Sequence, residues 1–312
     1  MALLFSSIND DAERWRNILV RELPDIDFRI WTHDGNEIGN PKEIEYVLTW
    51  QPKVGAFKNL PNLKYIFSLG AGVDHLKNKE LPKKIPVVRL MDPGLTRGMS
   101  EYVLFWVLYH HRRMGDYFQN AQQTKWKQFP QANTCIRNIG IMGLGVLGLD
   151  SAKKLKALGF NVHGWTRSSK KIEGISTFHG KEEFYDFLRR SEILVCLLPL
   201  TPETEGIINT ETITRLPKGA TIINPARGGH IIDNDLIQAI DNGHISDAVL
   251  DVFHSEPLPE KHPFWTHPKI NITPHIASLT VPETAALVVA DNIRRIRSGQ
   301  LPEPIVDPKL GY

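Results

Sequence analysis

The chain contains 312 residues, of which 41% are hydrophobic and 23% are charged, a composition typical of a globular protein with room for two cores. Its 37 basic residues nearly balance 35 acidic ones, so the formal net charge of +2 excludes a general attraction to nucleic acid or anionic lipid. No apolar run approaches the ~20 residues that a membrane-spanning helix needs. We therefore expect two domains, and neither nucleic acid nor a membrane as a partner.

The two cysteines indicate the redox compartment. Cys135 and Cys196 lie far apart in the sequence and do not form a CxxC pair. This spacing disfavours a disulfide framework or a zinc module and favours a reducing compartment. We therefore predict a cytoplasmic protein without a metal site.

The first hundred residues alternate short apolar runs with amphipathic or polar stretches. Five of these runs are predicted to be buried strands: Leu3–Ser6, Phe28–Thr32, Tyr46–Trp50, Tyr65–Leu69 and Val87–Leu90. A helix is predicted over Asp11–Glu22. Strands separated by helix-length segments indicate βαβ units and a parallel sheet, whose ligands bind at the carboxyl ends of the strands.

A long segment from Ser100 to about Ala121 is predicted to be one helix, because it lacks proline and is rich in good helix formers. Such a helix would bridge two lobes or contact a second subunit, although a helix that is simply buried fits the pattern equally well. A last helix is predicted from Pro282 to Arg297.

A second alternating block begins at Arg137 and is more regular than the first. It contains six predicted strands: Asn138–Met142, Asn161–Thr166, Ile193–Pro199, Thr221–Ala226, Ala248–Phe253 and Ile270–Pro274. Helix candidates separate most of them, which predicts a six-stranded, doubly wound parallel sheet. Both blocks together place the protein in the α/β class.

The first motif of this block is a GxGxxG sequence made of Gly143, Leu144, Gly145, Val146, Leu147 and Gly148. It follows a predicted strand and opens a helix predicted over Val146–Leu158, the context in which this pattern binds dinucleotides. Gly143 permits a tight turn, Gly145 lets the backbone approach a pyrophosphate, and Gly148 lets the helix lie close to the sheet. A glycine turn without a ligand is the alternative, but the strand-turn-helix-strand order favours a phosphate site at the helix amino end.

An NAD-selective site usually has an acidic residue at the end of the second strand. No carboxylate occurs from Asn161 through Ile172, and the strand end instead carries Trp165, Thr166, Arg167, Ser168 and Lys170. A guanidinium, hydroxyls and an ammonium suit a 2′-phosphate. This segment therefore predicts NADP(H) rather than NAD(H), the alternative being that Arg167 and Lys170 only decorate a solvated loop.

Three polar residues follow predicted parallel strands of the second block, where such a sheet binds its ligands: Arg227, Glu256 and His275. Taken singly, each has an ordinary structural explanation as a turn residue, a solvated carboxylate or a structural imidazole. Taken together beside a nicotinamide cofactor, they supply the groups that reduce a 2-keto acid.

Each of the three side chains has a distinct predicted role. Arg227 would bind the substrate carboxylate and polarise the carbonyl as the hydride arrives. His275 would donate a proton to the nascent alkoxide. Glu256 would hydrogen-bond the other imidazole nitrogen, orienting the ring and favouring its protonated form.

With these motifs in this order, the chain resembles the D-isomer-specific 2-hydroxyacid dehydrogenases over essentially its whole length. The resemblance rests on Gly143–Gly148, Asn224–Gly229, Asp251–Phe253 with Glu256-Pro257, and Thr273–His275. Within the family it is most similar to the bacterial glyoxylate/hydroxypyruvate reductase A branch, through Leu69–Asp74, Trp165–Ser168 and Gly311-Tyr312. That branch prefers NADPH, in agreement with the missing acid.

The resemblance implies two Rossmann-like, doubly wound parallel-sheet domains with a cleft between them. It implies a discontinuous substrate-binding domain over residues 1–99 and 281–312 and an NADP-binding domain over residues 100–280. The helix beginning near Ser100 would join the lobes and contribute to a homodimer.

The resemblance also implies roles for individual residues. Arg227, Glu256 and His275 match the catalytic positions, and the backbone N–H groups of Gly70, Ala71 and Gly72 match a loop that binds the substrate carboxylate. Further matches on the cofactor side are Leu198, Pro199 and Leu200 beside the nicotinamide ribose, Pro225 and Ala226, and Asp251 near the carboxamide. Pro225 stands where the branch often has leucine. Trp50 would form a wall of a small substrate pocket, unless it is a packing residue.

The activity implied is NADPH-dependent reduction of glyoxylate to glycolate and of hydroxypyruvate to D-glycerate. One alternative is a dehydrogenase for another D-2-hydroxy acid. Another is a dinucleotide-sensing protein that resembles a corepressor, since one fold can serve several functions.

Overall fold

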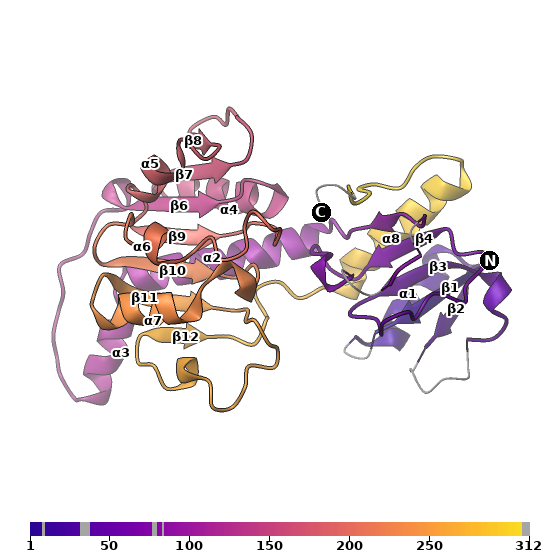
Figure 1. Cartoon of the computed structure of the whole chain (residues 1–312), viewed down its shortest axis with the longest axis horizontal. Helices are drawn as coiled ribbons and strands as arrows, with labels where there is room; N and C mark the ends of the chain where they lie inside the picture. The colour runs from indigo at the N-terminus through magenta and orange to yellow at the C-terminus, as the bar shows by residue number, and fades with distance from the viewer. Residues whose placement is uncertain (8–9, 32–37, 77–79, 83, 308–312) are drawn as a thin grey trace. The chain divides into compact units, whose positions relative to one another are not determined.

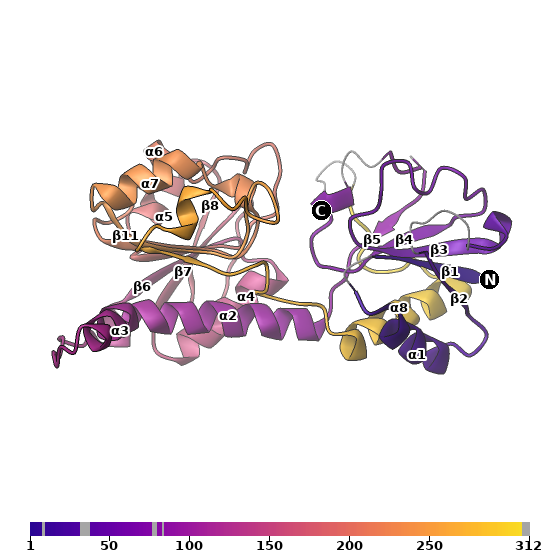
Figure 2. The ribbon, with the colours of Figure 1, turned by 90° about the horizontal axis from the view of Figure 1, so that it is seen from below.

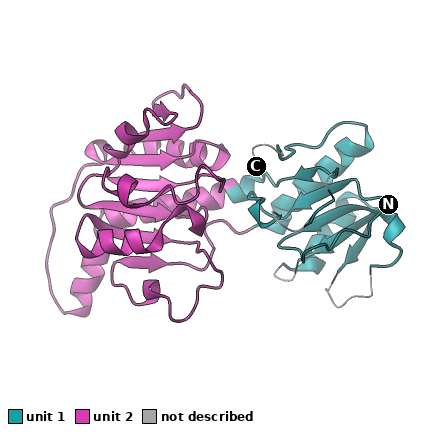
Figure 3. Cartoon of the chain, viewed as in Figure 1, with its two compact units in different colours: residues 1–95, 280–312 teal, residues 96–279 magenta. Residues whose placement is uncertain are grey.

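A computed structural model describes the chain except for residues 8–9, 32–37, 77–79, 83 and 308–312. The chain divides into two compact units, coloured separately in Figure 3. Unit 1 comprises Met1–Leu95 and Thr280–Tyr312, and unit 2 comprises Thr96–Leu279.

Unit 1 is built on a five-stranded parallel sheet in the order β2-β1-β3-β4-β5. Its strands are β1 (Ala2–Ser6), β2 (Asp27–Ile30), β3 (Ile44–Thr49), β4 (Tyr65–Ser68) and β5 (Val87–Val88). Thr32, predicted to end the second strand, lies outside the described residues. Helices α1 (Ala12–Glu22) and α8 (Pro282–Arg297) pack together on one face of this sheet, as Figure 2 shows. The apolar face of α8 thereby completes a core that the first ninety residues alone would leave open.

Unit 2 is built on a seven-stranded parallel sheet in the order β12-β11-β10-β9-β6-β7-β8 (Figure 1). Its strands are β6 (Asn138–Met142), β7 (Asn161–Thr166), β8 (Ser176–His179), β9 (Ile193–Cys196), β10 (Ala220–Asn224), β11 (Ile245–Leu250) and β12 (Ile270–Ile272). The predicted count of six was wrong because β8 was missed. This edge strand has no buried residue, so it lacks the apolar run by which strands are recognised.

The predicted α/β class and doubly wound architecture are confirmed. The chain runs outward from β6 through β7 to β8 and then returns to β9 on the other side of β6. This reversal is the switch point at which such sheets bind ligands, outside the carboxyl ends of the strands.

Helices cover both faces of this second sheet. Figure 2 shows α2 (Pro93–His111) and α4 (Val146–Ala157) on one face, and α5 (Phe184–Leu188), α6 (Thr210–Ile213) and α7 (Asp233–Asp241) on the other. None of the helices among the described residues is long and apolar enough to cross a membrane.

The long helix predicted from Ser100 to Ala121 is two helices. The first, α2, begins earlier, at Pro93, where the fixed φ of proline suits a first turn and Asp92 accepts a hydrogen bond from the Leu95 N–H. It ends at His111, and α3 (Met114–Gln122) follows Arg113, which adopts a left-handed conformation with φ of +58°. The Arg113 guanidinium lies 4.0 Å from the centre of the Phe129 ring, a contact that stabilises this break.

Candidate functional site

The glycine turn joins β6 to α4. Gly143 has φ of +97°, which favours glycine, and its N–H donates to the Trp165 carbonyl at 2.9 Å. A Cβ on Gly148 would overlap the Gly143 carbonyl oxygen, so helix and turn pack too closely for any side chain. A Cβ on Gly145 would meet nothing within 4 Å, and no side chain caps the start of α4 there. The open space beside uncapped N–H groups fits a pyrophosphate.

The end of β7 carries the residues predicted to bind a 2′-phosphate, and they divide into two groups. The indole of Trp165 donates to the Gly180 carbonyl at 2.7 Å, and the buried hydroxyl of Thr166 donates to the Ser168 carbonyl at 2.7 Å. These two side chains are therefore engaged within the protein. Arg167, Ser168 and Lys170 are exposed, and the Lys170 ammonium donates to the Leu144 carbonyl at 2.9 Å. A cation thus lies directly at the glycine turn.

The loops after β9 and β10 are connected by the buried side chain of His230. Its Nδ1 lies 3.0 Å from the Arg227 carbonyl oxygen and its Nε2 lies 3.3 Å from the Pro199 carbonyl oxygen. Burial alone would lower the pKa of His230, but the interactions with Cys196 and the two carbonyls raise it overall. Sequence analysis gave this residue no role. It follows Arg227 by three positions and belongs to no recognised motif.

The predicted cofactor residues on these two loops lie around that connection. Leu198, Pro199 and Leu200 are half-buried, whereas Pro225 and Ala226 are buried. Asn224 shapes the β10 loop, because its side chain accepts from the Ala226 N–H at 3.1 Å and donates to the Arg227 carbonyl at 2.9 Å.

Glu256 and His275 are in direct contact. Nδ1 of His275 lies 2.7 Å from Oε2 of Glu256, and Oε1 of Glu256 accepts from the Phe253 N–H at 3.0 Å. Burial would raise the pKa of Glu256, but the hydrogen bonds from His275 and Phe253 and the charge of Arg227 lower it overall. The carboxylate is therefore ionised at neutral pH and holds the imidazole by its Nδ1–H, which leaves Nε2 for another partner.

The loop bearing Arg227 packs against the loop bearing Glu256. Arg227 is half-buried, and its Nη1 donates to the Ala226 carbonyl at 2.6 Å. A Cβ on Gly228 would overlap the backbone of Phe253, so only glycine allows this approach. The structure thus gathers the three predicted residues from three neighbouring strand ends, β10, β11 and β12.

The carboxylate of Asp251 positions the segment that carries His275. Asp251 is 0% exposed and accepts from the Thr273 hydroxyl at 2.6 Å, the Ile276 N–H at 2.9 Å and the Ala277 N–H at 2.8 Å. Burial raises its pKa, although these hydrogen bonds oppose the shift. The Tyr102 hydroxyl lies 2.6 Å from the Thr273 hydroxyl. Sequence analysis named Thr273 within a motif but gave it no role, and it missed Tyr102, because only the fold brings α2 beside β12.

In unit 1, Trp50 packs over the predicted substrate loop. Its ring lies 4.0 Å, centre to centre, from that of His75, and a Cβ on Gly70 would come within 2.6 Å of the indole. The Gly70 N–H donates to the Ser68 hydroxyl at 3.2 Å and is therefore engaged within the loop. Ala71 and Gly72 are half-buried. That this loop binds the substrate carboxylate stays a prediction.

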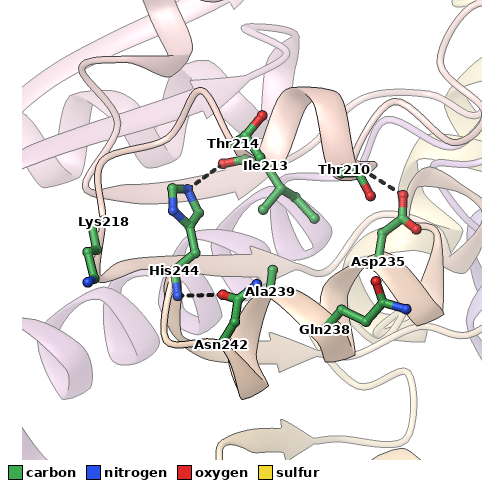
Figure 4. Close-up of a pocket in the computed structure, with 9 residues that line it drawn as sticks. All are labelled: Thr210, Ile213, Thr214, Lys218, Asp235, Gln238, Ala239, Asn242 and His244. Carbon is green, nitrogen blue, oxygen red and sulfur yellow. Dashed lines mark hydrogen bonds between the residues drawn. The ribbon is translucent and has the colours of Figure 1, made fainter.

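Two further observations concern metal ligands and cavities. Among the described residues, no group of three or more histidine, cysteine or acidic side chains could hold a metal ion. A cavity of about 310 Å³ lies along α6 and α7, with Thr210, Ile213, Thr214, Lys218, Asp235, Gln238, Ala239, Asn242 and His244 around it (Figure 4). Several of these residues precede β10 and β11, so the cavity extends toward the amino ends of these strands. Arg227 lies at the opposite, carboxyl end of β10.

Comparison with known proteins shows the family of the chain. Residues 104–277 match the family model described as D-isomer specific 2-hydroxyacid dehydrogenase, NAD binding domain. The chain belongs to this family. It is 42% identical to a glyoxylate/hydroxypyruvate reductase A of Serratia proteamaculans over 100% of both chains.

Two solved structures of 2-hydroxyacid dehydrogenases are similar over the whole chain. A D-isomer specific 2-hydroxyacid dehydrogenase from Xanthobacter autotrophicus Py2, in complex with NADPH and MES, has a TM-score of 0.95 at 42% identity, covering 100% of this chain and 99% of that one. The NADPH-dependent glyoxylate/hydroxypyruvate reductase of Sinorhizobium meliloti, in complex with NADP and sulfate, has a TM-score of 0.93 at 35% identity and covers 100% of both.

Proposed function

We propose that this protein reduces glyoxylate to glycolate and hydroxypyruvate to D-glycerate, using NADPH. The observation that carries the proposal is the 2.7 Å contact between Glu256 and His275, formed at the carboxyl edge of the sheet where the Arg227 loop also packs. The printed activity of the relatives from Serratia and Sinorhizobium supports the choice of substrates.

The glycine turn fits a dinucleotide cofactor, and the residues after β7 favour NADP(H) over NAD(H). Gly143 and Gly148 shape the turn, the open space at Gly145 and the uncapped N–H groups at the start of α4 would hold the pyrophosphate, and Arg167, Ser168 and Lys170 would bind the 2′-phosphate. When bound, the nicotinamide supplies a hydride. Leu198 to Leu200, Pro225, Ala226 and Asp251 are the residues assigned to the nicotinamide side.

Arg227 and His275 then act on the 2-keto acid. Arg227 binds the carboxylate and polarises the carbonyl, so negative charge that develops on the oxygen is stabilised. His275 gives its proton to that oxygen from Nε2, which completes the alcohol. Glu256 keeps the ring oriented through its contact with Nδ1. In unit 1, we assign Trp50 and the Gly70–Gly72 loop to substrate binding.

Initial rates with NADPH and NADH against glyoxylate, hydroxypyruvate and pyruvate test this proposal. We expect the highest kcat/KM for one of the first two acids with NADPH. A preference for pyruvate would identify a dehydrogenase for another 2-hydroxy acid, and turnover of none of the three would refute the proposal.

We also propose a cytoplasmic homodimer. Both cysteines are free thiols, as a reducing compartment requires. Large apolar side chains are exposed on α2, α3 and the segment that follows, and they are Phe105, Phe118, Trp126 and Ile136. Trp126 is 98% exposed, an arrangement that favours a protein partner. Light scattering should give twice the chain mass, and a monomer at micromolar concentration would contradict the assignment.

A further inference from the structure

Glu256 lies in a connection that has little regular structure. Between the end of β11 at Leu250 and the start of β12 at Ile270, the described chain forms one short turn of 3₁₀ helix, Pro263–Trp265. A loop of this kind does not fix a side chain by itself. The contacts that hold it to the rest of unit 2 therefore decide how firmly Glu256 meets His275.

The side chain of His254 provides one such contact. Its Nε2 lies 2.9 Å from the Ile231 carbonyl oxygen and 3.4 Å from Oδ1 of Asp233. Both neighbours are acceptors, so Nε2 carries a proton and donates it. Ile231 is buried, and its own N–H donates to the Gly228 carbonyl at 3.0 Å. The loop is thereby tied to a fixed part of the fold.

Asp233 holds the same loop at a second point. Nε2 of His262 lies 3.4 Å from Oδ2 of Asp233, and Nδ1 of His262 accepts from the Phe264 N–H at 3.4 Å. Because Nδ1 accepts a hydrogen bond, it is Nε2 that carries a proton toward the carboxylate. One carboxylate at the start of α7, which runs beside β11 in Figure 1, thus contacts the loop on both sides of Glu256.

We propose that His254, held by Ile231 and Asp233, is a positioning residue for the Glu256–His275 pair, an inference that rests on the proposed function. Few bonds separate His254 from the carboxylate of Glu256. His254 is adjacent to Phe253, whose N–H donates to Oε1 of Glu256 at 3.0 Å, while Oε2 meets His275 at 2.7 Å. Removing the His254 contact frees this turn, and the carboxylate then holds the imidazole less firmly.

The experiment compares His254→Ala with His267→Ala. His267 is a matched control, because its Nε2 lies 3.3 Å from Oδ1 of Asp241 and ties the same connection to the other end of α7. His254→Ala should lower kcat for 2-keto acid reduction roughly threefold to tenfold, part of the full contribution of an acid–base residue, with KM for NADPH unchanged. His267→Ala should leave kcat within about twofold.

Two further variants separate positioning from general loosening of the loop. His254→Gln places an amide N–H near the Ile231 carbonyl and should recover most of kcat. In a Glu256→Gln background, His254→Ala should cause no further loss, because the group it positions is already gone. Equal losses in His254→Ala and His267→Ala, or no loss in His254→Ala, would overturn the proposal.

A spectroscopic measurement decides the matter without turnover. In protein labelled with ¹⁵N-histidine, the Nδ1–H of His275 should give a sharp low-field resonance in the wild type and in His267→Ala, and should broaden in His254→Ala. An unchanged resonance in His254→Ala, or none in the wild type, refutes the positioning role. A wild type that reduces no 2-keto acid refutes the proposed function instead, so the two failures are distinguishable.

Discussion

The two units share a parallel α/β design, but their strand ends differ in chemistry. Unit 2 ends its strands in ionisable side chains, Arg227, Glu256 and His275, which are tied together by hydrogen bonds and close backbone packing. Unit 1 ends β3 and β4 in an indole and a run of small residues, where Trp50 covers Gly70. From this difference we infer that the proton transfer takes place at the strand ends of unit 2, and that unit 1 contributes the shape of the substrate pocket.

The largest effect should come from the polar residues of unit 2. Arg227→Ala and His275→Asn should each lower kcat/KM for the keto acid by about 10²-fold or more, because each removes an interaction that strengthens in the transition state. Steady-state rates measure this, with NADPH affinity from fluorescence titration as the control. Near-normal turnover in both variants would contradict the assignment of chemistry to unit 2.

Acid should weaken unit 2 through a buried histidine. Burial lowers the pKa of His163 to about 4, and its Nε2 lies 3.0 Å from the Ser191 hydroxyl. The unfolded ring binds a proton near pH 6.5 and the folded ring resists it, so stability is lost as the pH falls from about 6.5 to 4, by up to about 3 kcal/mol. Hydrogen exchange of unit 2 peptides should show this loss, with unit 1 peptides as an internal reference. His163→Gln should flatten the profile, and an unchanged profile would exclude this cause.

The glycines of the β6 turn should separate ligand binding from packing. Gly145→Ala should weaken NADPH binding about tenfold while the melting temperature of the free protein stays the same, since its Cβ enters open space. Gly148→Ala should lower that melting temperature, since its Cβ overlaps the Gly143 carbonyl. Calorimetry and titration of both variants check this, and an unchanged affinity in Gly145→Ala would remove the pyrophosphate from this turn.

Cofactor choice should depend on the charge after β7. Arg167→Asp should shift the ratio of kcat/KM for NADPH and NADH about tenfold toward NADH, because a carboxylate repels the 2′-phosphate and accepts from a ribose hydroxyl. Arg190→Asp, a change of equal charge elsewhere in unit 2, is the control. An unchanged ratio would remove Arg167 from the selectivity argument.

The smallest effect should come from unit 1. Trp50→Ala should raise KM for the keto acid roughly threefold to tenfold and leave kcat nearly unchanged, because a wall of the pocket contributes equally to ground-state and transition-state binding. A loss of kcat as large as that of His275→Asn would contradict the assignment of Trp50 to substrate binding alone.

Much of the fold could be predicted, because apolar runs and glycine turns depend mainly on residues that are close in the sequence. The strand β6, the turn at Gly143 and the helix α4 were all predicted within a residue or two. The edge strand β8 was not, since none of its residues is fully buried, and neither was the break at Arg113, where a basic residue adopts a conformation typical of glycine.

The amino-acid sequence by itself determined the class of the fold, the cofactor turn and the three polar residues, since each depends on local pattern and spacing. Tertiary structure alone decided which residues support the site. Asp251 and Tyr102 hold the segment that carries His275, His230 contacts the carbonyl of Arg227, and Asp233 contacts His254 in the loop that carries Glu256. The physical reason is the separation along the chain over which each kind of interaction acts. Hydrophobic periodicity and turn propensity act over a few residues, whereas a hydrogen bond between distant segments exists only once the sheet has brought the ends of separate strands together.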